Sequence, residues 1–201
     1  MEFFVIGVII AVIIVAAFGF SKSGSGGNTT AEPPHRIAGR QGERVATRYI
    51  ESVLREGDTL FTNVSVSYDG RSAELDNVIV NKYGVFIIEV KNYSGRLSGS
   101  EDDYEWTKVH ISKAGNRYVK SVKNPIKQVK REVYILAKFL DYYGASVWVE
   151  GYAMIIDAAS PTESKFILSS LADIDRAVHT SEKRRLNSST VDAVKKLLSQ
   201  E

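Results

Sequence analysis

Apolar positions recur at helical spacing in some segments of the chain and form short β-branched runs in others. Ala46, Ile50 and Leu54 mark one face of a helix that Gly57 closes, because glycine readily adopts the backbone conformation that ends helices. Runs rich in Val and Ile predict strands. In chain order we expect a helix, three strands, a helix, a strand, a short strand and a terminal helix, over residues 39–56, 60–68, 78–80, 85–90, 124–144, 148–156, 166–168 and 188–198, with strand-like patches also between Trp106 and Ile111. This order is typical of an α/β fold with a mixed sheet.

The segment Asn81–Gly84 sets the register of the two central strands. Asn at the first position and Gly at the fourth favour a type I turn, and a hairpin centred there pairs Val80 with Val85. Counting outward from this pair places Asp76 opposite Glu89. Directly opposed side chains have Cβ atoms roughly 4.5–5.5 Å apart, so the pattern predicts two carboxylates close together.

The same count places Glu74 opposite Lys91, and side-chain alternation puts all four charged residues on one face. Opposed carboxylates repel each other unless a cation or a proton intervenes. Mg²⁺ and Mn²⁺ prefer oxygen ligands, so the pair predicts a metal site at Asp76 and Glu89. Lys91 would lie beside that metal, where its charge can stabilise a phosphate or help to position a water.

A solvent-facing strand with an incidental Lys–Glu pair is the alternative interpretation of these charges. Near the turn, however, residues 78–80 and 85–88 are apolar on both faces of the predicted hairpin. Strands that are apolar on both faces are central and covered in most folds. This placement favours the metal interpretation over the incidental pair.

The composition excludes several kinds of chemistry. The 201 residues include no cysteine, which excludes disulfides, zinc–cysteine sites and thiol nucleophiles. The three histidines, His35, His110 and His179, lie far apart in the sequence and show no metal-ligand spacing. The formal charge of +2 is near neutral, so attraction to a polyanion has to come from a local cluster of basic residues.

Phe3–Phe20 is an apolar run long enough for a membrane-spanning helix, and we expect residues 1–20 to form an uncleaved anchor. A cleaved signal peptide is the alternative, but only Met1 and Glu2 precede the run, without a basic start. Residues 21–34 are rich in Ser and Gly and predict a flexible linker that spans roughly 20 Å. The first basic residues, Lys22, Arg36 and Arg40, all follow the run. Because basic residues favour the cytoplasmic side, this order predicts a single-pass protein of the cell membrane with a cytoplasmic domain.

Between residues 107 and 131 the chain holds eight basic side chains and no acidic one, with Tyr118 among them and Trp106 directly before them. A segment of one sign attracts nucleic acid, and its binding weakens steeply as salt is added. A solvated basic face, or attraction to anionic lipid headgroups, is the alternative interpretation. The candidate nucleic-acid-binding residues are Lys108, Lys113, Arg117, Lys120, Lys123, Lys127, Lys130 and Arg131.

Several segments together resemble the nuclease-related domain (NERD) family, a branch of the PD-(D/E)xK endonuclease-like superfamily. The Glu-Val-Lys triplet alone is a weak signal, whereas the complete ordered set is specific. The set extends over about 90 residues and consists of Gly39–Glu43, Glu74–Val80, Gly84–Tyr93 with Gly95, Trp106, and Asn124–Gln128.

The resemblance implies roles for five residues. It implies that Asp76 and Glu89 are metal ligands, that Lys91 is the catalytic lysine, and that the cofactor is Mg²⁺ or Mn²⁺. It further implies that Glu43 is the acidic residue of the first helix and Gln128 the polar residue of the helix after the core strands. The implied architecture is a restriction-endonuclease-like mixed β-sheet flanked by helices.

We therefore expect residues 35–160 to form the nuclease-related domain and residues 161–201 to form a strand and helix extension packed on it. The expected function is a membrane-anchored, metal-dependent nuclease that hydrolyses phosphodiester bonds, with DNA favoured over RNA as substrate. The alternative is a non-catalytic module of the same fold that binds nucleic acid or a protein.

Overall fold

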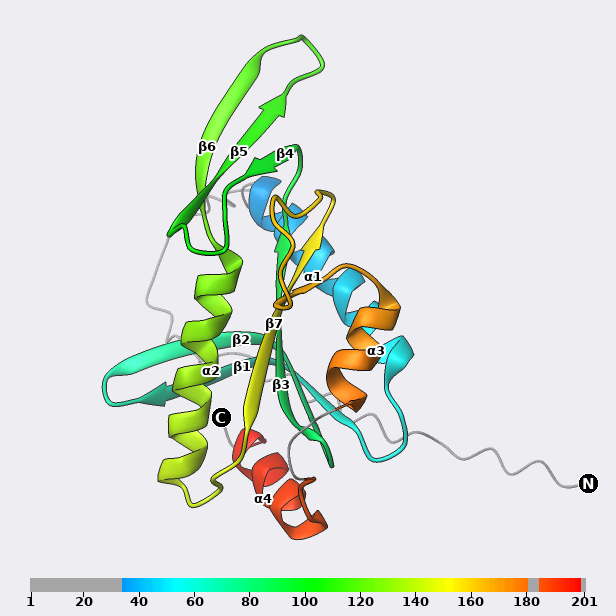
Figure 1. The fold of residues 1–201 in the computed structure, drawn as a ribbon, viewed down its shortest axis with the longest axis vertical. Coiled ribbons are helices and arrows are strands. Elements are labelled where there is room, and N and C mark those ends of the chain that lie inside the picture. The colour runs from blue at the N-terminus through cyan, green and yellow to red at the C-terminus, as the bar shows by residue number, and fades with distance from the viewer. Residues whose placement is uncertain (1–33, 181–184, 200–201) are drawn as a thin grey trace, which may run out of the picture.

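A computed structural model describes residues 34–180 and 185–199 of the chain. The ribbon in Figure 1 shows one sheet with helices on both faces and a hairpin that projects from one end. In chain order the elements are α1 (Pro34–Val53), β1 (Thr59–Tyr68), β2 (Arg71–Asn81), β3 (Gly84–Asn92), β4 (Arg96–Ser98), β5 (Glu105–Ile111), β6 (Arg117–Lys123), α2 (Pro125–Tyr142), β7 (Val149–Ile156), β8 (Ile167–Leu168), α3 (Leu171–His179) and α4 (Ser188–Leu198).

The main sheet has five strands in the order β1-β2-β3-β7-β8. β1, β2 and β3 pair antiparallel, whereas β7 pairs parallel with β3 and β8 parallel with β7. Between β3 and β7 the chain first forms a second, three-stranded sheet, β4-β5-β6, and then α2. The prediction of an α/β fold with a mixed sheet and flanking helices is confirmed.

The predicted register of the central hairpin is also confirmed. Val80 pairs with Val85, and Asn81 pairs with Gly84 across the turn. The ladder between β2 and β3 ends at the pair Asn77 and Ile88. The strands separate at the next position, which is where the predicted carboxylate pair lies.

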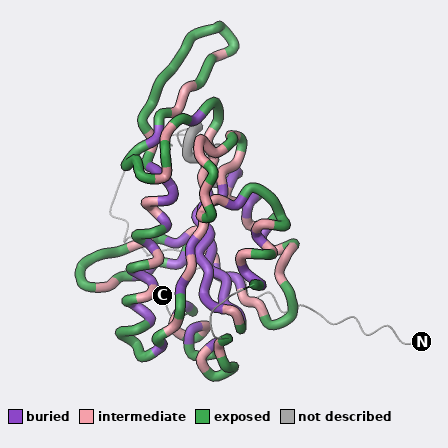
Figure 2. Tube along the Cα trace, in the orientation of Figure 1, coloured by how far each residue is buried: buried purple, intermediate pink, exposed green. Residues whose placement is uncertain are grey.

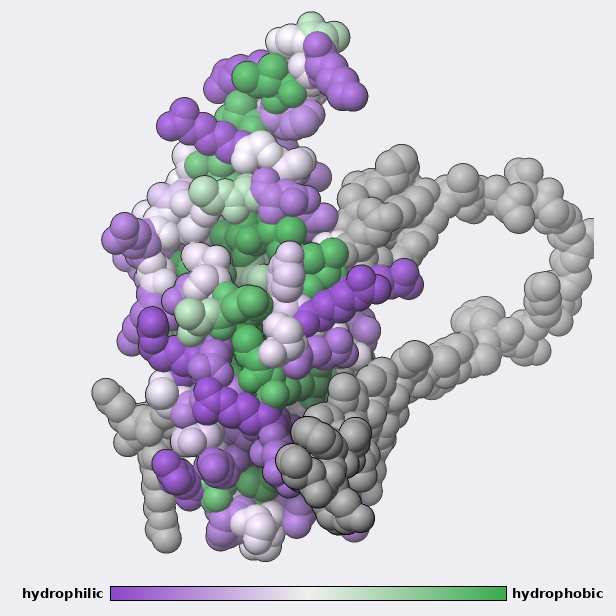
Figure 3. Space-filling model, turned by 90° about the vertical axis from the view of Figure 1, so that its right-hand side faces the viewer, coloured by the Kyte–Doolittle hydropathy of each residue, from purple (hydrophilic) through white to green (hydrophobic). Residues whose placement is uncertain are grey.

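Each face of the central strands is buried under helices (Figure 2). Val78, Val80, Val85 and Ile87 pack in one core with the apolar residues of α2 and α4. The opposite face, which includes Phe86, packs in a second core with α1 and α3. Seen from the side of α1 and α3, hydrophobic side chains gather down the middle of the molecule (Figure 3). The hairpin is central and covered, as its sequence predicts.

Some boundaries differ from the expectation. α1 begins at Pro34, the residue that we expected to end the linker, and α3, β4 and β6 were not predicted as elements. The strand-like patches between Trp106 and Ile111 form β5. The elements after residue 160 lie on both faces of the main sheet, since α4 joins the core of α2 and α3 joins the core of α1.

The predicted anchor of residues 1–20 and almost all of the linker lie outside the described residues. Over 34–180 and 185–199, no helix has the length and apolar character that a membrane crossing requires.

The hairpin of β5 and β6 projects beyond the main sheet at the top of Figure 1. Most of its residues are exposed, and only its root is buried, where Trp106 packs with Leu97 and Ile126. Asn124 follows this hairpin and caps α2, because its Oδ1 accepts a hydrogen bond of 2.9 Å from the backbone N–H of Ile126. The cap fixes the start of α2 against the end of β6.

Candidate active site

A groove of about 820 Å³ lies where β2 and β3 separate, beside the first turns of α2. It contains the predicted residues Asp76, Glu89, Lys91 and Gln128, which the fold brings together from two strands and a helix. The remaining lining comes from the first half of β2, the root of the β5–β6 hairpin and α2, and consists of Ser72, Ala73, Glu74, Tyr104, Glu105, Lys123, Asn124, Lys127, Arg131 and Glu132.

Asp76 lies on β2 one residue beyond the end of the ladder with β3. Its Oδ2 accepts a hydrogen bond of 2.8 Å from the backbone N–H of Val90, which holds the carboxyl between the two strands. Burial and the charge of Glu89 raise the pKa of Asp76 from 3.8 to about 7, although Val90 and Lys91 act in the opposite direction. This carboxyl group therefore binds a proton much more readily than an exposed aspartate does.

Glu89 is 1% exposed and lies on β3. Its Oε1 accepts hydrogen bonds from Lys91 Nζ and, at 2.5 Å, from Gln128 Nε2. Its Oε2 is buried and has no hydrogen-bond partner among the described residues. Burial and the nearby charge of Glu132 raise the pKa of Glu89 to about 7.

Glu132 is a third acidic residue of this site, and the sequence prediction missed it. It is 2% exposed on α2. Its Oε1 accepts a hydrogen bond of 2.9 Å from Gln128 Nε2, while its Oε2 has no partner within the described part of the chain. Burial raises the pKa of Glu132 to about 7. The sequence does hold a signal for it, because Glu132 lies three residues after Val129 and four before Leu136. This spacing places the side chain on the apolar stripe of the helix and so predicts that it is buried.

Lys91 is the cation of the cluster. Burial lowers its pKa, but the charge of Glu89, the hydrogen bond to it and the charge of Asp76 outweigh this effect. The pKa of Lys91 consequently lies above its ordinary value, so the side chain is protonated at neutral pH. An ammonium group is thus held against a buried carboxylate at the end of the groove.

Glu43 does not line this groove. It lies on α1 in a second hollow of about 440 Å³, which Asp76 and Asn77 also line. In that hollow Thr47 Oγ1 donates a hydrogen bond of 3.0 Å to Asn77 Oδ1. The charge of Glu43 contributes to the raised pKa of Asp76, and Asp76 lines both hollows, so it connects Glu43 with the groove.

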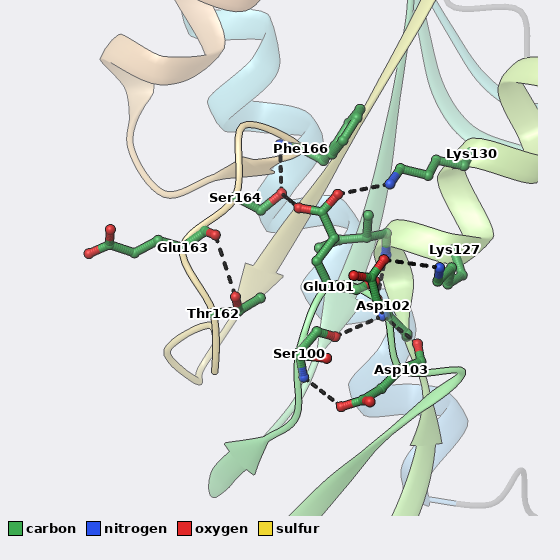
Figure 4. Close-up of polar contacts among 12 residues, drawn as sticks. Ser100, Glu101, Asp102, Asp103, Lys127, Lys130, Thr162, Glu163, Ser164 and Phe166 are labelled. Atoms are coloured by element: carbon green, nitrogen blue, oxygen red, sulfur yellow. Dashed lines mark hydrogen bonds and ion pairs between the residues drawn. The ribbon is translucent and has the colours of Figure 1, made fainter.

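The eight basic candidates separate into three groups. Lys123, Lys127 and Arg131 line the groove. Lys130 instead forms a 2.8 Å ion pair with Glu101, which also accepts a hydrogen bond from Ser164 (Figure 4). The others lie on the β5–β6 hairpin and its turn, outside the groove lining, and are Lys108, Lys113, Arg117 and Lys120.

Comparison with known proteins places the chain in a family. The family described as "nuclease-related domain" matches residues 38–156. The chain belongs to the nuclease-related domain family. An uncharacterized protein of Bacillus anthracis is 31% identical over 70 residues, which are 34% of this chain and 33% of that protein, so the match spans about a third of the relative's length. No solved structure was found to match the chain.

The description of this family relates its domain to nucleases. The carboxylates of the groove fit a hard cation, because such ions prefer oxygen ligands. Two buried carboxylate oxygens, Glu89 Oε2 and Glu132 Oε2, have no hydrogen-bond partner among the described residues and could coordinate the ion. Within residues 34–180 and 185–199, no three acidic, His or Cys side chains are already arranged to hold a metal. Lys91 supplies the positive charge beside Glu89 in this arrangement.

Proposed function

We propose that this chain is a Mg²⁺- or Mn²⁺-dependent nuclease that hydrolyses phosphodiester bonds, with DNA favoured over RNA. The observation that carries the proposal is the cluster of three carboxyl groups with raised pKa values, beside a protonated lysine, in a groove that Lys123, Lys127 and Arg131 also line. Basic side chains attract the phosphate backbone, and carboxylates hold the metal that phosphodiester hydrolysis uses.

Asp76 and Glu89 would hold the metal, and Glu132, which lines the same groove from α2, would move toward them to supply a third oxygen ligand. A bound divalent ion supplies neutralisation of the phosphate charge and lowers the pKa of a bound water. Lys91 Nζ, which is protonated, would donate hydrogen bonds to the phosphate oxygens as charge develops on them. Lys127 and Arg131 in the groove wall would hold the flanking phosphates.

Gln128 acts as a positioning residue in this proposal. A single Nε2 donates to both Glu89 Oε1 and Glu132 Oε1, so it holds the two carboxyls at a fixed separation. Their second oxygens are thereby left free to bind a cation. Glu43 would act across the sheet, because its charge favours a compensating positive charge near Asp76.

The test is cleavage of plasmid and single-stranded DNA by the full chain with Mg²⁺ or Mn²⁺. We expect cleavage by the wild type and a loss of roughly 100-fold or more in Asp76→Asn, Glu89→Gln and Lys91→Ala. Glu56→Gln is the matched control, since Glu56 is exposed and lies outside the groove lining. Cleavage that is absent, or that survives these substitutions, would overturn the proposal.

A non-catalytic nucleic-acid-binding module is the second candidate. It is favoured by the contact between Lys91 and Glu89, which neutralises the buried carboxylate without a metal. This candidate predicts salt-sensitive DNA binding that is unchanged by EDTA and by Asp76→Asn. Calorimetric titration of wild type and Asp76→Asn with Mg²⁺ separates the candidates, because only a nuclease site loses metal affinity on the substitution.

We also propose that Phe3–Phe20 anchors the chain in the cell membrane, with the domain on the cytoplasmic side. The support is the apolar run itself and the basic residues that follow it. Carbonate extraction of membranes tests the anchor, and protease protection in sealed vesicles tests the side.

A further inference from the structure

A stripe of basic and aromatic residues follows one exposed face of α2. The stripe consists of Lys127, Arg131, Tyr134, Lys138 and Tyr142, at spacings of four, three, four and four residues. These spacings place all five side chains on one side of a helix, over a length of about 22 Å. The stripe contains no carboxylate, and its two rings are 46% and 72% exposed at Tyr134 and Tyr142.

Residues at the end of β1, at the start of β2 and directly after α2 contact these rings. Arg71 Cζ lies 5.7 Å from the ring centroid of Tyr134. The ring of Tyr68 meets that of Tyr142 edge-on at 6.1 Å. Tyr143 adds a second edge-on contact to Tyr142 at 5.1 Å. Rings that are fixed by neighbours and yet remain open to solvent lose little entropy when they bind another flat group.

The stripe begins inside the groove of the carboxylates. Lys127 and Arg131 line that groove, and Arg131 Nη2 also donates a hydrogen bond of 2.9 Å to the carbonyl of Ser72. Tyr134 follows one helical turn beyond Arg131. A strand whose phosphate lies in the groove would therefore leave it along the face that carries the two rings.

We propose that this stripe binds a single-stranded segment of nucleic acid that adjoins the phosphate held in the groove. The inference rests on the proposed function and adds its substrate class, which is a strand with unpaired bases beside the cleavage point. Unpaired bases can stack on Tyr134 and Tyr142, while paired bases are already stacked on each other. Lys138 and Arg71 lie beside the rings, where they would meet the intervening phosphates.

The experiment measures binding separately from cleavage. Full-length protein carrying Asp76→Asn, in EDTA, is titrated against fluorescent oligo-dT and against a duplex of equal length. We expect Tyr134→Ala and Tyr142→Ala each to weaken single-strand binding roughly tenfold, and duplex binding much less. Tyr134→Phe and Tyr142→Phe should keep the affinity, because they retain the ring. Tyr49→Ala is the matched control, since Tyr49 is also 46% exposed but lies on α1.

Single-strand affinity that is unchanged by both alanine variants overturns the inference, as does an equal loss on duplex and single strand. An inactive wild type whose single-strand binding still depends on both rings would overturn the nuclease proposal and leave the stripe assignment intact. An active nuclease whose single-strand binding does not depend on the two rings would overturn the stripe assignment and leave the nuclease proposal intact.

Discussion

The carboxyl of Glu89 shows how a single buried residue is stabilised and also kept available. One oxygen accepts from Lys91 and Gln128, while the other has no partner in the described chain. Burying an unpartnered carboxylate oxygen is costly, so the group keeps a raised pKa. The same arrangement suits a cation, because an ion that enters the groove can bind Glu89 Oε2 without breaking a hydrogen bond.

His179 is a second buried polar residue, remote from the groove lining. Its Nδ1 lies 2.8 Å from Asp175 Oδ1 and its Nε2 lies 2.8 Å from Asp58 Oδ2, so it joins α3 to the loop before β1. We expect His179→Ala to lower the free energy of unfolding by about 3 kcal/mol, because the buried carboxylate of Asp58 loses its ring partner.

Urea unfolding of wild type and variant measures this effect. His110→Ala is the control, since His110 is exposed on β5 and no loss of stability is expected there. Equal midpoints for wild type and His179→Ala would contradict the assigned role of the residue.

At the scale of elements, the sequence predicts strand register and helix starts correctly where a turn or a cap is formed by adjacent residues. The Asn81–Gly84 turn predicts the register of β2 and β3, and Asn124-Pro125 predicts the start of α2. α3 was missed, since only three of its nine residues are buried and its apolar stripe is short. β4 and β6 were missed because their exposed positions show no clear alternation of apolar and polar residues.

The packing of α2 on β7 depends on a residue without a side chain. A Cβ atom at Gly151 would lie 2.5 Å from Val133 Cγ2 and 2.8 Å from Val129 Cγ2, which is closer than carbon atoms approach. We expect Gly151→Ala to lower the free energy of unfolding by about 1–3 kcal/mol through this overpacking. Thermal unfolding measured by circular dichroism tests it.

A second substitution distinguishes steric overlap from any backbone effect. Val133→Ala removes the methyl group that the new Cβ would meet first. The double variant Gly151→Ala/Val133→Ala should be more stable than the sum of the single effects predicts. Additive losses of stability would show that steric overlap with Val133 does not cause the effect of Gly151→Ala.

At the scale of the whole molecule, the sequence predicts pairs within one hairpin but not partners from different elements. Counting from a turn brings Asp76 and Glu89 together, whereas nothing local connects them with Glu132 on α2. The eight basic residues looked equivalent in the sequence. The fold separates them, because Lys130 meets Glu101 while Arg131, the next residue, turns into the groove.

The three coupled carboxyls predict how the stability of the whole domain depends on pH. Their folded pKa values of about 7 lie above the ordinary values of 3.8 for Asp76 and 4.5 for Glu89 and Glu132. Between those limits the folded state binds more protons than the unfolded state, so stability falls as pH rises. In EDTA, the free energy of unfolding should be lower at pH 8 than at pH 5 by about 2 kcal/mol or more.

Glu132→Gln should raise the stability at pH 8 and flatten this dependence, because it removes one of the three charges that repel each other in the folded state. Glu56→Gln, at an exposed position, should leave the dependence of stability on pH unchanged.

Mg²⁺ should stabilise the wild type at pH 8 much more than at pH 5, since the ion binds only the deprotonated cluster. Urea unfolding at both pH values, with EDTA or with Mg²⁺, measures all of these effects. A flat wild-type profile in EDTA would mean that the three carboxyls are already neutralised without protons.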